Sequence, residues 1–93
     1  MIRSFRDKRT IALFLGDYVK GIPADLAERA QRKLLILDKA IVLNELRAPP
    51  GNRLEALKHS RAGQHAIRVN DQWRICFRWT AAGVEDVEFT DYH

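Results

Sequence analysis

The sequence predicts a single α+β domain over residues 1–93, in which two N-terminal helices pack on one face of a small, mainly antiparallel sheet. Between residues 8 and 46, apolar side chains recur at steps of three and four, which is typical of amphipathic helices. Between residues 53 and 91, apolar and polar residues alternate in short segments bounded by turn-forming residues, which is typical of strands. A chain of 93 residues is long enough for one hydrophobic core. The expected element order is β-α-α-β-β-β.

The first half of the chain begins with a short strand and a helix. Residues 1–5, "MIRSF", are expected to form an edge or leading strand. Ile11, Leu15 and Tyr18 follow at helical spacing within residues 8–19. They predict a first helix whose apolar face these three side chains form.

A longer helix is expected from Pro23 to Leu46. Proline suits the first turn of a helix, because the N–H that it lacks has no partner there. The segment "RAPPGN", residues 47–52, is expected to end the helix. The apolar face is expected to comprise Leu26, Ala30, Leu34, Leu37 and Ile41.

The second half of the chain is predicted to be β. "NRLEALKH", residues 52–59, is a short strand or extended segment, and "RAGQ", residues 61–64, is a turn. A β-hairpin follows that includes "RVNDQWRICFRW", residues 68–79. A turn at residues 82–83 leads into the last strand.

The apolar alternation fixes the register of this hairpin. A three-residue loop, residues 70–72, pairs Val69 with Trp73 and Ile67 with Ile75, so that one face is apolar throughout. A two-residue loop would instead turn the apolar residues of one strand to the wrong face. The three-residue loop is therefore expected, and His65 then faces the apolar side.

The same register places Arg68 directly opposite Arg74 on the polar face. Like charges in this position are destabilising by up to about 1 kcal/mol, unless acidic neighbours or a bound anion offset them. Two interpretations follow. In the first, the arginines lie on a solvated face and are splayed apart or paired with Glu55 or Asp91. In the second, they form a phosphate site from two guanidinium groups. Arg78, further along the strand, is interpreted as surface charge.

Composition narrows the class of protein. Sixteen Lys and Arg residues against twelve Asp and Glu give a net charge of +4, which favours an acidic partner such as nucleic acid. The chain has a single cysteine, Cys76, which excludes an intrachain disulfide and is expected to be buried or half-buried. The three histidines have no metal-ligand spacing. No signal sequence or membrane-spanning run is present, so a cytoplasmic protein with no membrane partner is expected.

The polar residues of the second half contain acids, bases and cations, but no activated serine or cysteine. Such a set can cleave RNA without a metal. One group assists the ribose 2′-OH in its attack on the adjacent phosphorus, cations stabilise the phosphoryl charge, and an acid protonates the leaving 5′-oxygen. DNA lacks the nucleophile. The set comprises Glu55, Lys58, Arg68, Arg74, Asp91, Tyr92 and His93, with His59 and Arg61 beside Lys58.

Three segments carry a family resemblance. "MIRSF" at the start, "LRAPPGNRLEALKHSRAGQHAIRVNDQWRICFRW" at residues 46–79 and "DYH" at residues 91–93 resemble the HigB toxins of the RelE/ParE superfamily, particularly the plasmid-maintenance killer-protein group. The resemblance covers nearly the whole chain. Residues 49–79 and 91–93 are its specific part, and the helices match only in pattern.

The resemblance implies a RelE-like α+β toxin of a type II toxin–antitoxin system. Such a toxin enters the A site of the 70S ribosome, cuts mRNA between codon bases and inhibits translation. The resemblance also implies a helix-turn-helix antitoxin of the HigA type. The toxin–antitoxin complex would repress its own operon, so operator DNA would be contacted only through that complex. No cofactor and no metal are expected.

The resemblance also implies the site. By motif, Lys58 matches the lysine of "L-x-x-L-K", Arg74 the arginine of "W-R-I", and residues 91–93 the terminal "DYH". His93 or Tyr92 is then expected to transfer a proton. Lys58 and Arg74 would stabilise the phosphoryl charge, while Glu55 or Asp91 would orient the reactants or act as base. The RNA phosphate contacts are expected from Arg68, Arg61 and His59.

Two departures from the family pattern alter this expectation. Glu55 stands where some HigB-like proteins carry a histidine in the "L-x-x-L-K" segment, which changes the candidates for the base. Asn70 stands where they carry an arginine before the hairpin turn. Arg68, two residues earlier and on the same face of the strand, is expected to take over a phosphate contact.

Two other functions remain open from the sequence. One is a ParE-like inhibitor that binds gyrase and cleaves nothing, and the other is an RNA- or ribosome-binding module without catalysis. A gyrase inhibitor needs neither the terminal "DYH" nor the arginines at 68 and 74, which is why the endonuclease is favoured.

Overall fold

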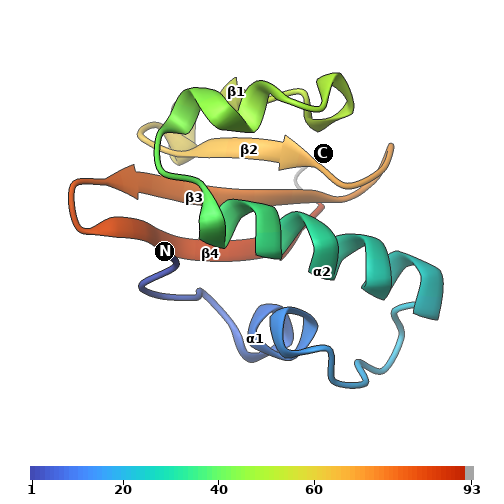
Figure 1. The fold of residues 1–93 in the computed structure, drawn as a ribbon. Helices are drawn as coiled ribbons and strands as arrows, with labels where there is room; N and C mark the ends of the chain where they lie inside the picture. Colours follow the sequence, from blue (N-terminus) through green and yellow to red (C-terminus); the bar gives the residue numbers. More distant parts are fainter. Residues whose placement is uncertain (92–93) are drawn as a thin grey trace.

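The computed structural model describes residues 1–91 and confirms the α+β class, with two α-helices on a four-stranded antiparallel sheet (Figure 1). The strands are ordered β1-β2-β3-β4 across the sheet. The helices are α1 (Lys8–Leu15) and α2 (Ala24–Lys39), the strands are β1 (Glu55–Ala56), β2 (His65–Arg68), β3 (Arg74–Thr80) and β4 (Gly83–Thr90), and the short 3₁₀ helices are η1 (Leu43–Arg47), η2 (Pro50–Asn52) and η3 (His59–Arg61).

The N-terminal segment lies beside β4 without forming a regular strand. Ile2 and Phe5 make isolated parallel bridges with Val84 and Val87. The predicted leading strand is therefore reduced to two bridges, which extend the sheet past β4. Among residues 1–91, neither α-helix is both long enough and apolar enough to cross a membrane.

Helix α1 buries a different face from the predicted one. Thr10 and Leu13 are buried, whereas Ile11, Leu15 and Tyr18 are exposed. The Thr10 hydroxyl accepts a hydrogen bond of 3.0 Å from a backbone N–H of β4, so a polar side chain occupies the contact with the sheet. The helix has only eight residues and ends before Tyr18. Its two sides are both rich in apolar residues, so spacing alone favoured the wrong side.

Helix α2 begins near Pro23, as predicted, but ends at Lys39 rather than at Leu46. Ile41, the last residue of the predicted apolar face, is 83% exposed. The carboxylate of Glu45 accepts hydrogen bonds from the backbone N–H groups of Ile41 and the next residue, and this starts η1. The buried side chains of α2 are Ala30, Leu34 and Leu37.

The predicted hairpin register is confirmed. Ile67 pairs with Ile75 and Arg68 with Arg74, and the Val69 N–H donates to the carbonyl of Trp73 over 3.0 Å. The pairing of β3 with β4 is interrupted after Cys76 by a β-bulge. The apolar face of the sheet contributes the largest buried side chains to a core shared with α1, α2 and η1, including Ile67, Ile75, Phe77, Val87 and Phe89.

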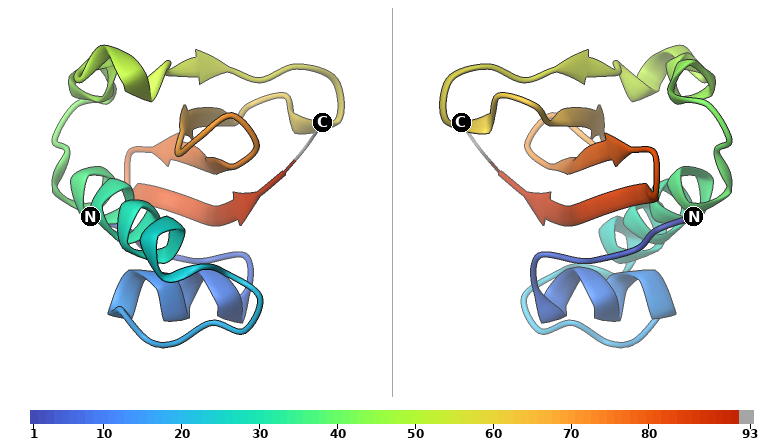
Figure 2. Two further views of the ribbon diagram at one scale, coloured as in Figure 1. Left: turned by 90° about the vertical axis from the view of Figure 1, so that its right-hand side faces the viewer. Right: turned by 90° about the vertical axis from the view of Figure 1, so that its left-hand side faces the viewer.

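The helices lie to one side of the sheet, and Figure 2 shows α2 along that face with α1 below β4. Within residues 1–91, no α-helix covers the opposite face. This uncovered face carries the polar side chains of β2 and β3, and it positions most of the predicted site.

Candidate functional site

The face of the sheet opposite α2, here called the polar face, brings together charged residues from four segments. One row across the strands reads Glu55, Ala66, Cys76 and Glu88, and the adjacent row reads Arg68, Arg74 and Thr90. Because side chains at equivalent positions of paired strands share a face, these rows lie side by side. Strand pairing, rather than nearness in the sequence, assembles the site.

Arg61 and Glu88 form an ion pair on this face, with 3.2 Å between Nη1 and Oε1. Both side chains are largely buried. Arg61 also donates to the side chain of Gln64 over 3.1 Å. The pair fixes the loop of residues 57–64 to β4, although the loop and the strand are far apart in the sequence.

The same loop carries Lys58 and His59 as exposed residues at the start of η3. A hydrogen bond of 2.9 Å from the Leu57 N–H to the Gln64 carbonyl closes the loop at its base. The structure thus places both predicted residues, exposed to solvent, in the loop that Arg61 joins to β4.

Arg74 is anchored by the hairpin turn. Its Nη1 donates to the carbonyls of Asn70 and Trp73 over 2.5 and 3.2 Å. Within residues 1–91, no hydrogen bond of Nε or Nη2 is found. A guanidinium group has five N–H donors, so a fixed Arg74 still offers N–H groups to an anion.

Arg68 is opposite Arg74 along the backbone, and its side chain also reaches the hairpin loop. It forms an ion pair with Asp71 of the hairpin loop, an acidic residue that neither interpretation named. The Arg68 guanidinium holds the pKa of the exposed Asp71 carboxyl below its ordinary value. The like charges of the two arginines are therefore offset in part by one acidic neighbour.

Cys76 lies at the centre of the polar face and is fully buried, as predicted. Burial raises the pKa of its thiol to about 11, and nearby Arg61 lowers it only in part. A thiol with this pKa carries almost no thiolate at neutral pH. Cys76 is therefore a packing residue and not a nucleophile.

Asp91 follows β4 and is exposed, and its carboxylate accepts a hydrogen bond of 3.2 Å from the Gln72 side chain. This contact joins the end of β4 to the hairpin loop beside Arg74. The predicted proton-transfer residues, Tyr92 and His93, lie outside the described residues.

Glu88 is the residue of this site that the sequence reasoning missed. A signal was present, because Glu88 precedes the buried Phe89 and so faces away from the core, toward Cys76 on β3. However, β4 has a bulge, where Asp86 has a φ of 54°. The bulge shifts the alternation of apolar and polar residues in the part of β4 before Glu88, so the sequence pattern of the strand is irregular.

Three further residues lie near the site, and the predicted positions of His65 on the apolar side and of Arg78 at the surface are confirmed. His65 faces the apolar side and stacks on Phe77, with ring centroids 6.2 Å apart. Trp73 stacks on Phe89 at 4.5 Å and is partly buried against the core. Arg78 forms an ion pair of 3.3 Å with Asp86 at the surface.

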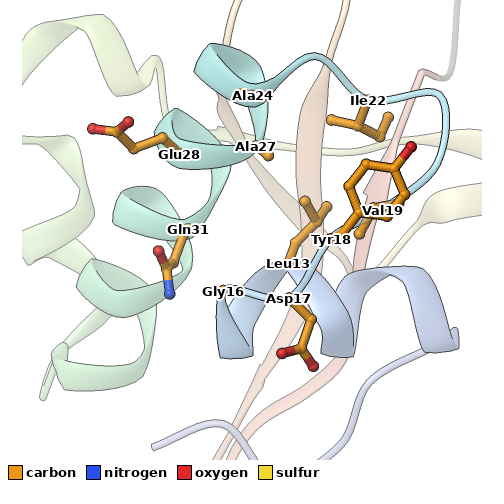
Figure 3. A pocket seen from close by; sticks show the side chains of 10 residues that line it. All are labelled: Leu13, Gly16, Asp17, Tyr18, Val19, Ile22, Ala24, Ala27, Glu28 and Gln31. Carbon is orange, nitrogen blue, oxygen red and sulfur yellow. The ribbon is translucent and has the colours of Figure 1, made fainter.

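A separate hollow of about 370 Å³ lies between α1 and α2 (Figure 3). Gly16 ends α1 there with a φ of 79°, and a Cβ at this position would lie 2.8 Å from the Gln31 side chain. The hollow contains none of the predicted site residues. Among residues 1–91, no three His, Cys, Asp or Glu side chains converge as metal ligands.

The polar face thus combines anchored cations with carboxylates at short range. Arg74 is held by backbone carbonyls, Arg61 is held by Glu88, and Lys58 is exposed in the loop that carries Arg61. Such a set is suited to binding a phosphodiester and stabilising charge that develops on it.

The comparison with known proteins identifies the family. The family model for the RelE-like toxin HigB of type II toxin–antitoxin systems matches residues 3–93. The chain belongs to the HigB-like toxin family. It is therefore a RelE-like toxin of a type II toxin–antitoxin system, and its family implies an antitoxin partner.

Individual relatives cover most of the chain. Toxin HigB-1 of Vibrio cholerae is 47% identical over 80 residues, which are 85% of this chain and 84% of the relative. Endoribonuclease HigB of Proteus vulgaris is 32% identical over 93 residues, the full length of both chains. An uncharacterised protein of Haemophilus influenzae is 34% identical over 76 residues, which are 81% of this chain and 75% of the relative.

Proposed function

We propose that this HigB-like toxin is a ribosome-dependent mRNA endoribonuclease that inhibits translation. The observation that carries the proposal is its similarity, over the full length of both chains, to the endoribonuclease HigB of Proteus vulgaris. The cations and carboxylates of the polar face support it, because they are the groups that RNA cleavage by the ribose 2′-OH requires.

In the proposed reaction, the 2′-oxygen loses its proton and attacks the adjacent phosphorus, and the bond from phosphorus to the 5′-oxygen breaks. The leaving 5′-oxygen takes up a proton. The products are a 2′,3′-cyclic phosphate and a 5′-OH end. No metal ion is needed where fixed side-chain cations stabilise the charge on the phosphoryl oxygens.

Each residue of the site has a proposed role. Arg74 and Lys58 stabilise the phosphoryl charge, and Glu55 or Asp91 orients the 2′-OH or acts as base. His93 or Tyr92 transfers the proton to the leaving group. Arg61 and His59 contact the flanking RNA phosphates.

Glu88 positions Arg61 in this scheme. Their ion pair of 3.2 Å holds the guanidinium above the sheet, so its direction is set before RNA binds. Arg68 also contacts RNA phosphate, at the border of the polar face.

The partners follow from the same proposal. The toxin acts in the cytoplasm in the A site of the 70S ribosome, with mRNA as substrate. A HigA-like helix-turn-helix antitoxin neutralises it, and the complex of the two contacts operator DNA through the antitoxin.

The test compares Arg74→Ala with Arg78→Ala after induction in a bacterial host. Arg74→Ala is expected to lower mRNA cleavage by about 10²–10³-fold, because one anchored donor to the phosphoryl group is lost. Arg78→Ala removes the same charge from the same strand, at a surface residue paired with Asp86, and should cleave normally. Primer extension on one message, with and without its start codon, measures cleavage and its dependence on translation.

Other outcomes separate the remaining candidates. Growth arrest with intact mRNA and inhibited DNA gyrase would contradict the proposal in favour of a ParE-like inhibitor. Ribosome binding without any cut would indicate a non-catalytic module. A message with 2′-deoxy sugars at the target codon should stay uncut.

A further inference from the structure

A hollow of about 420 Å³ opens between α2 and β2, next to the polar face but outside it. Arg29, Arg32 and Lys33 of α2 line one side, and Arg68 lines the other. The other lining residues are small or apolar: Ile36, Gly51 and Val69. Four cations thus surround one open hollow.

These cations face one another with little acidic compensation. Lys33 is partly buried, and its burial together with the charges of Arg29 and Arg68 lowers the pKa of its ammonium group. Its Nζ donates to the buried side chain of Asn52, which fixes it in place. The Nη1 of Arg29 lies 3.5 Å from the Val69 carbonyl.

Two acids lie near the hollow, and both are exposed. Glu28 forms an i,i+4 pair of 3.6 Å with Arg32, and both side chains are more than two-thirds exposed, so this pair is weak. Asp71, whose side chain is 99% exposed, pairs with Arg68. An anion that enters the hollow therefore meets Arg29 and Lys33 with no acidic partner of their own among residues 1–91.

The short strand β1 opens this hollow to the polar face. β1 pairs with β2 only through Glu55 and Ala56, so Arg68 lies beyond it at the edge of the sheet. Its side chain can reach α2, while its backbone is paired with that of Arg74. A strand of RNA held at Arg74 can therefore continue across Arg68 into the hollow.

We propose that Arg29, Lys33 and Arg68 form a phosphate-binding cradle that holds the RNA backbone on one side of the cleavage site. The lining offers guanidinium and ammonium groups but no aromatic surface, so it recognises phosphates without reading bases. Asp71 forms an ion pair with one of these cations, Arg68, until an RNA phosphate displaces the Asp71 carboxylate. The identification of RNA as the ligand rests on the proposed function, whereas the anion site itself does not.

The test measures binding of a fluorescein-labelled, fully 2′-O-methylated RNA, which cannot be cleaved because its 2′-oxygens are blocked. Arg29→Ala in the full chain is expected to weaken binding about tenfold. It should also reduce the slope of log Kd against log salt by about 0.7, the value for one lost phosphate contact to a single strand. Asp71→Asn should tighten binding, because it frees Arg68.

Lys39→Ala is the matched control. It removes one positive charge from the same helix at an exposed residue outside the hollow, so Kd and the salt slope should stay close to those of the unchanged protein. Equal effects of Arg29→Ala and Lys39→Ala, or no RNA binding at all, would overturn the cradle. Equally tight binding of polyglutamate would show an acidic protein to be the ligand and would overturn the assignment to RNA.

The cradle and the endonuclease can fail separately. If the methylated RNA binds as expected but translated mRNA is never cut, the cradle stands and the endonuclease does not. If mRNA is cut and Arg29→Ala changes neither RNA binding nor cleavage, the endonuclease stands and the cradle does not.

Discussion

Cys76 illustrates how a single residue can lie on a functional face without taking part in its chemistry. It lies between Ala66 and Glu88 on neighbouring strands and is fully buried. Its neighbours Arg61 and Arg74 favour a thiolate, but burial outweighs them and raises the thiol pKa from 9.0 to about 11. The residue therefore contributes packing under the charged layer.

The raised pKa predicts a stability that depends on pH. The unfolded chain loses the thiol proton near its ordinary pKa of 9.0, whereas the folded chain holds it to about 11. Unfolding is therefore favoured progressively as the pH rises through this window. Cys76→Ala should cost about 1 kcal/mol at pH 7, through lost packing, and less at pH 10.5. Urea unfolding at both pH values measures the difference, and a cost that does not change with pH would contradict the raised pKa.

At the scale of single residues, the sequence predicted the face of the sheet on which a side chain lies better than the side chains that it contacts. The alternation around the hairpin placed Arg68 opposite Arg74 and His65 on the apolar side, because strand register follows from which residues must be buried. It could not predict that Arg68 turns to Asp71, since a long side chain chooses among neighbours that become close only in the folded chain. Glu88 was missed for a related reason, because a bulge shifts the alternation in β4.

At the scale of elements, the irregular region between α2 and β1 depends on one buried side chain. Asn52 is fully buried, and its amide group donates to the carbonyls of Leu46 and Ala48 over 3.1 and 3.0 Å. Its oxygen accepts from Lys33 of α2. The two 3₁₀ helices η1 and η2 are thus held together, and to α2, by the hydrogen bonds of Asn52.

Asn52→Ala is therefore expected to destabilise the protein by about 2–3 kcal/mol, because it leaves the buried Leu46 carbonyl and the partly buried Ala48 carbonyl without this donor. Asn44→Ala serves as the control. Asn44 is exposed, and within residues 1–91 its side chain accepts a hydrogen bond only from nearby Arg47, so its loss should cost no more than about 0.5 kcal/mol. The midpoints of urea unfolding compare the two, and equal shifts would show that Asn52 does not have this role.

The same region shows why the end of α2 was mispredicted. The helical spacing continues through Ile41, so the periodicity extended the helix to Leu46. The helix instead ends where the Glu45 carboxylate binds two backbone N–H groups, which competes locally with the helical hydrogen bonds. In α1 the error concerns the face, because contact with β4 selected the polar Thr10 over Ile11. Contacts in the folded chain therefore decided where α2 ends and which face of α1 is buried, and the periodicity of the sequence does not reveal these contacts.

At the scale of the whole molecule, both α-helices, η1 and the three longer strands β2, β3 and β4 contribute to one core. Leu13 of α1, Leu37 of α2, Leu46 of η1 and Phe77 of β3 are buried in the same cluster. The radius of gyration of 12.1 Å agrees with the value of about 12 Å expected for one compact domain of this length. The charged surfaces on both sides of β2 are therefore supported by one shared core.

A shared core predicts that the chain unfolds as one cooperative unit, in keeping with the single domain expected from the sequence. The two tryptophans lie at opposite ends of the β3 region, Trp73 beside Phe89 and Trp79 beside Val84. Trp73→Phe and Trp79→Phe leave one indole each, so fluorescence reports one end of the sheet at a time.

In urea, the fluorescence transition of each variant should coincide with its transition in far-UV circular dichroism, and the free energy of unfolding should fall by about 1 kcal/mol per molar urea. Comparing the two signals within one variant removes any effect of the substitution on stability. A fluorescence transition that precedes the loss of helix in either variant would mean that one end of the sheet opens on its own, and the single cooperative core would then be wrong.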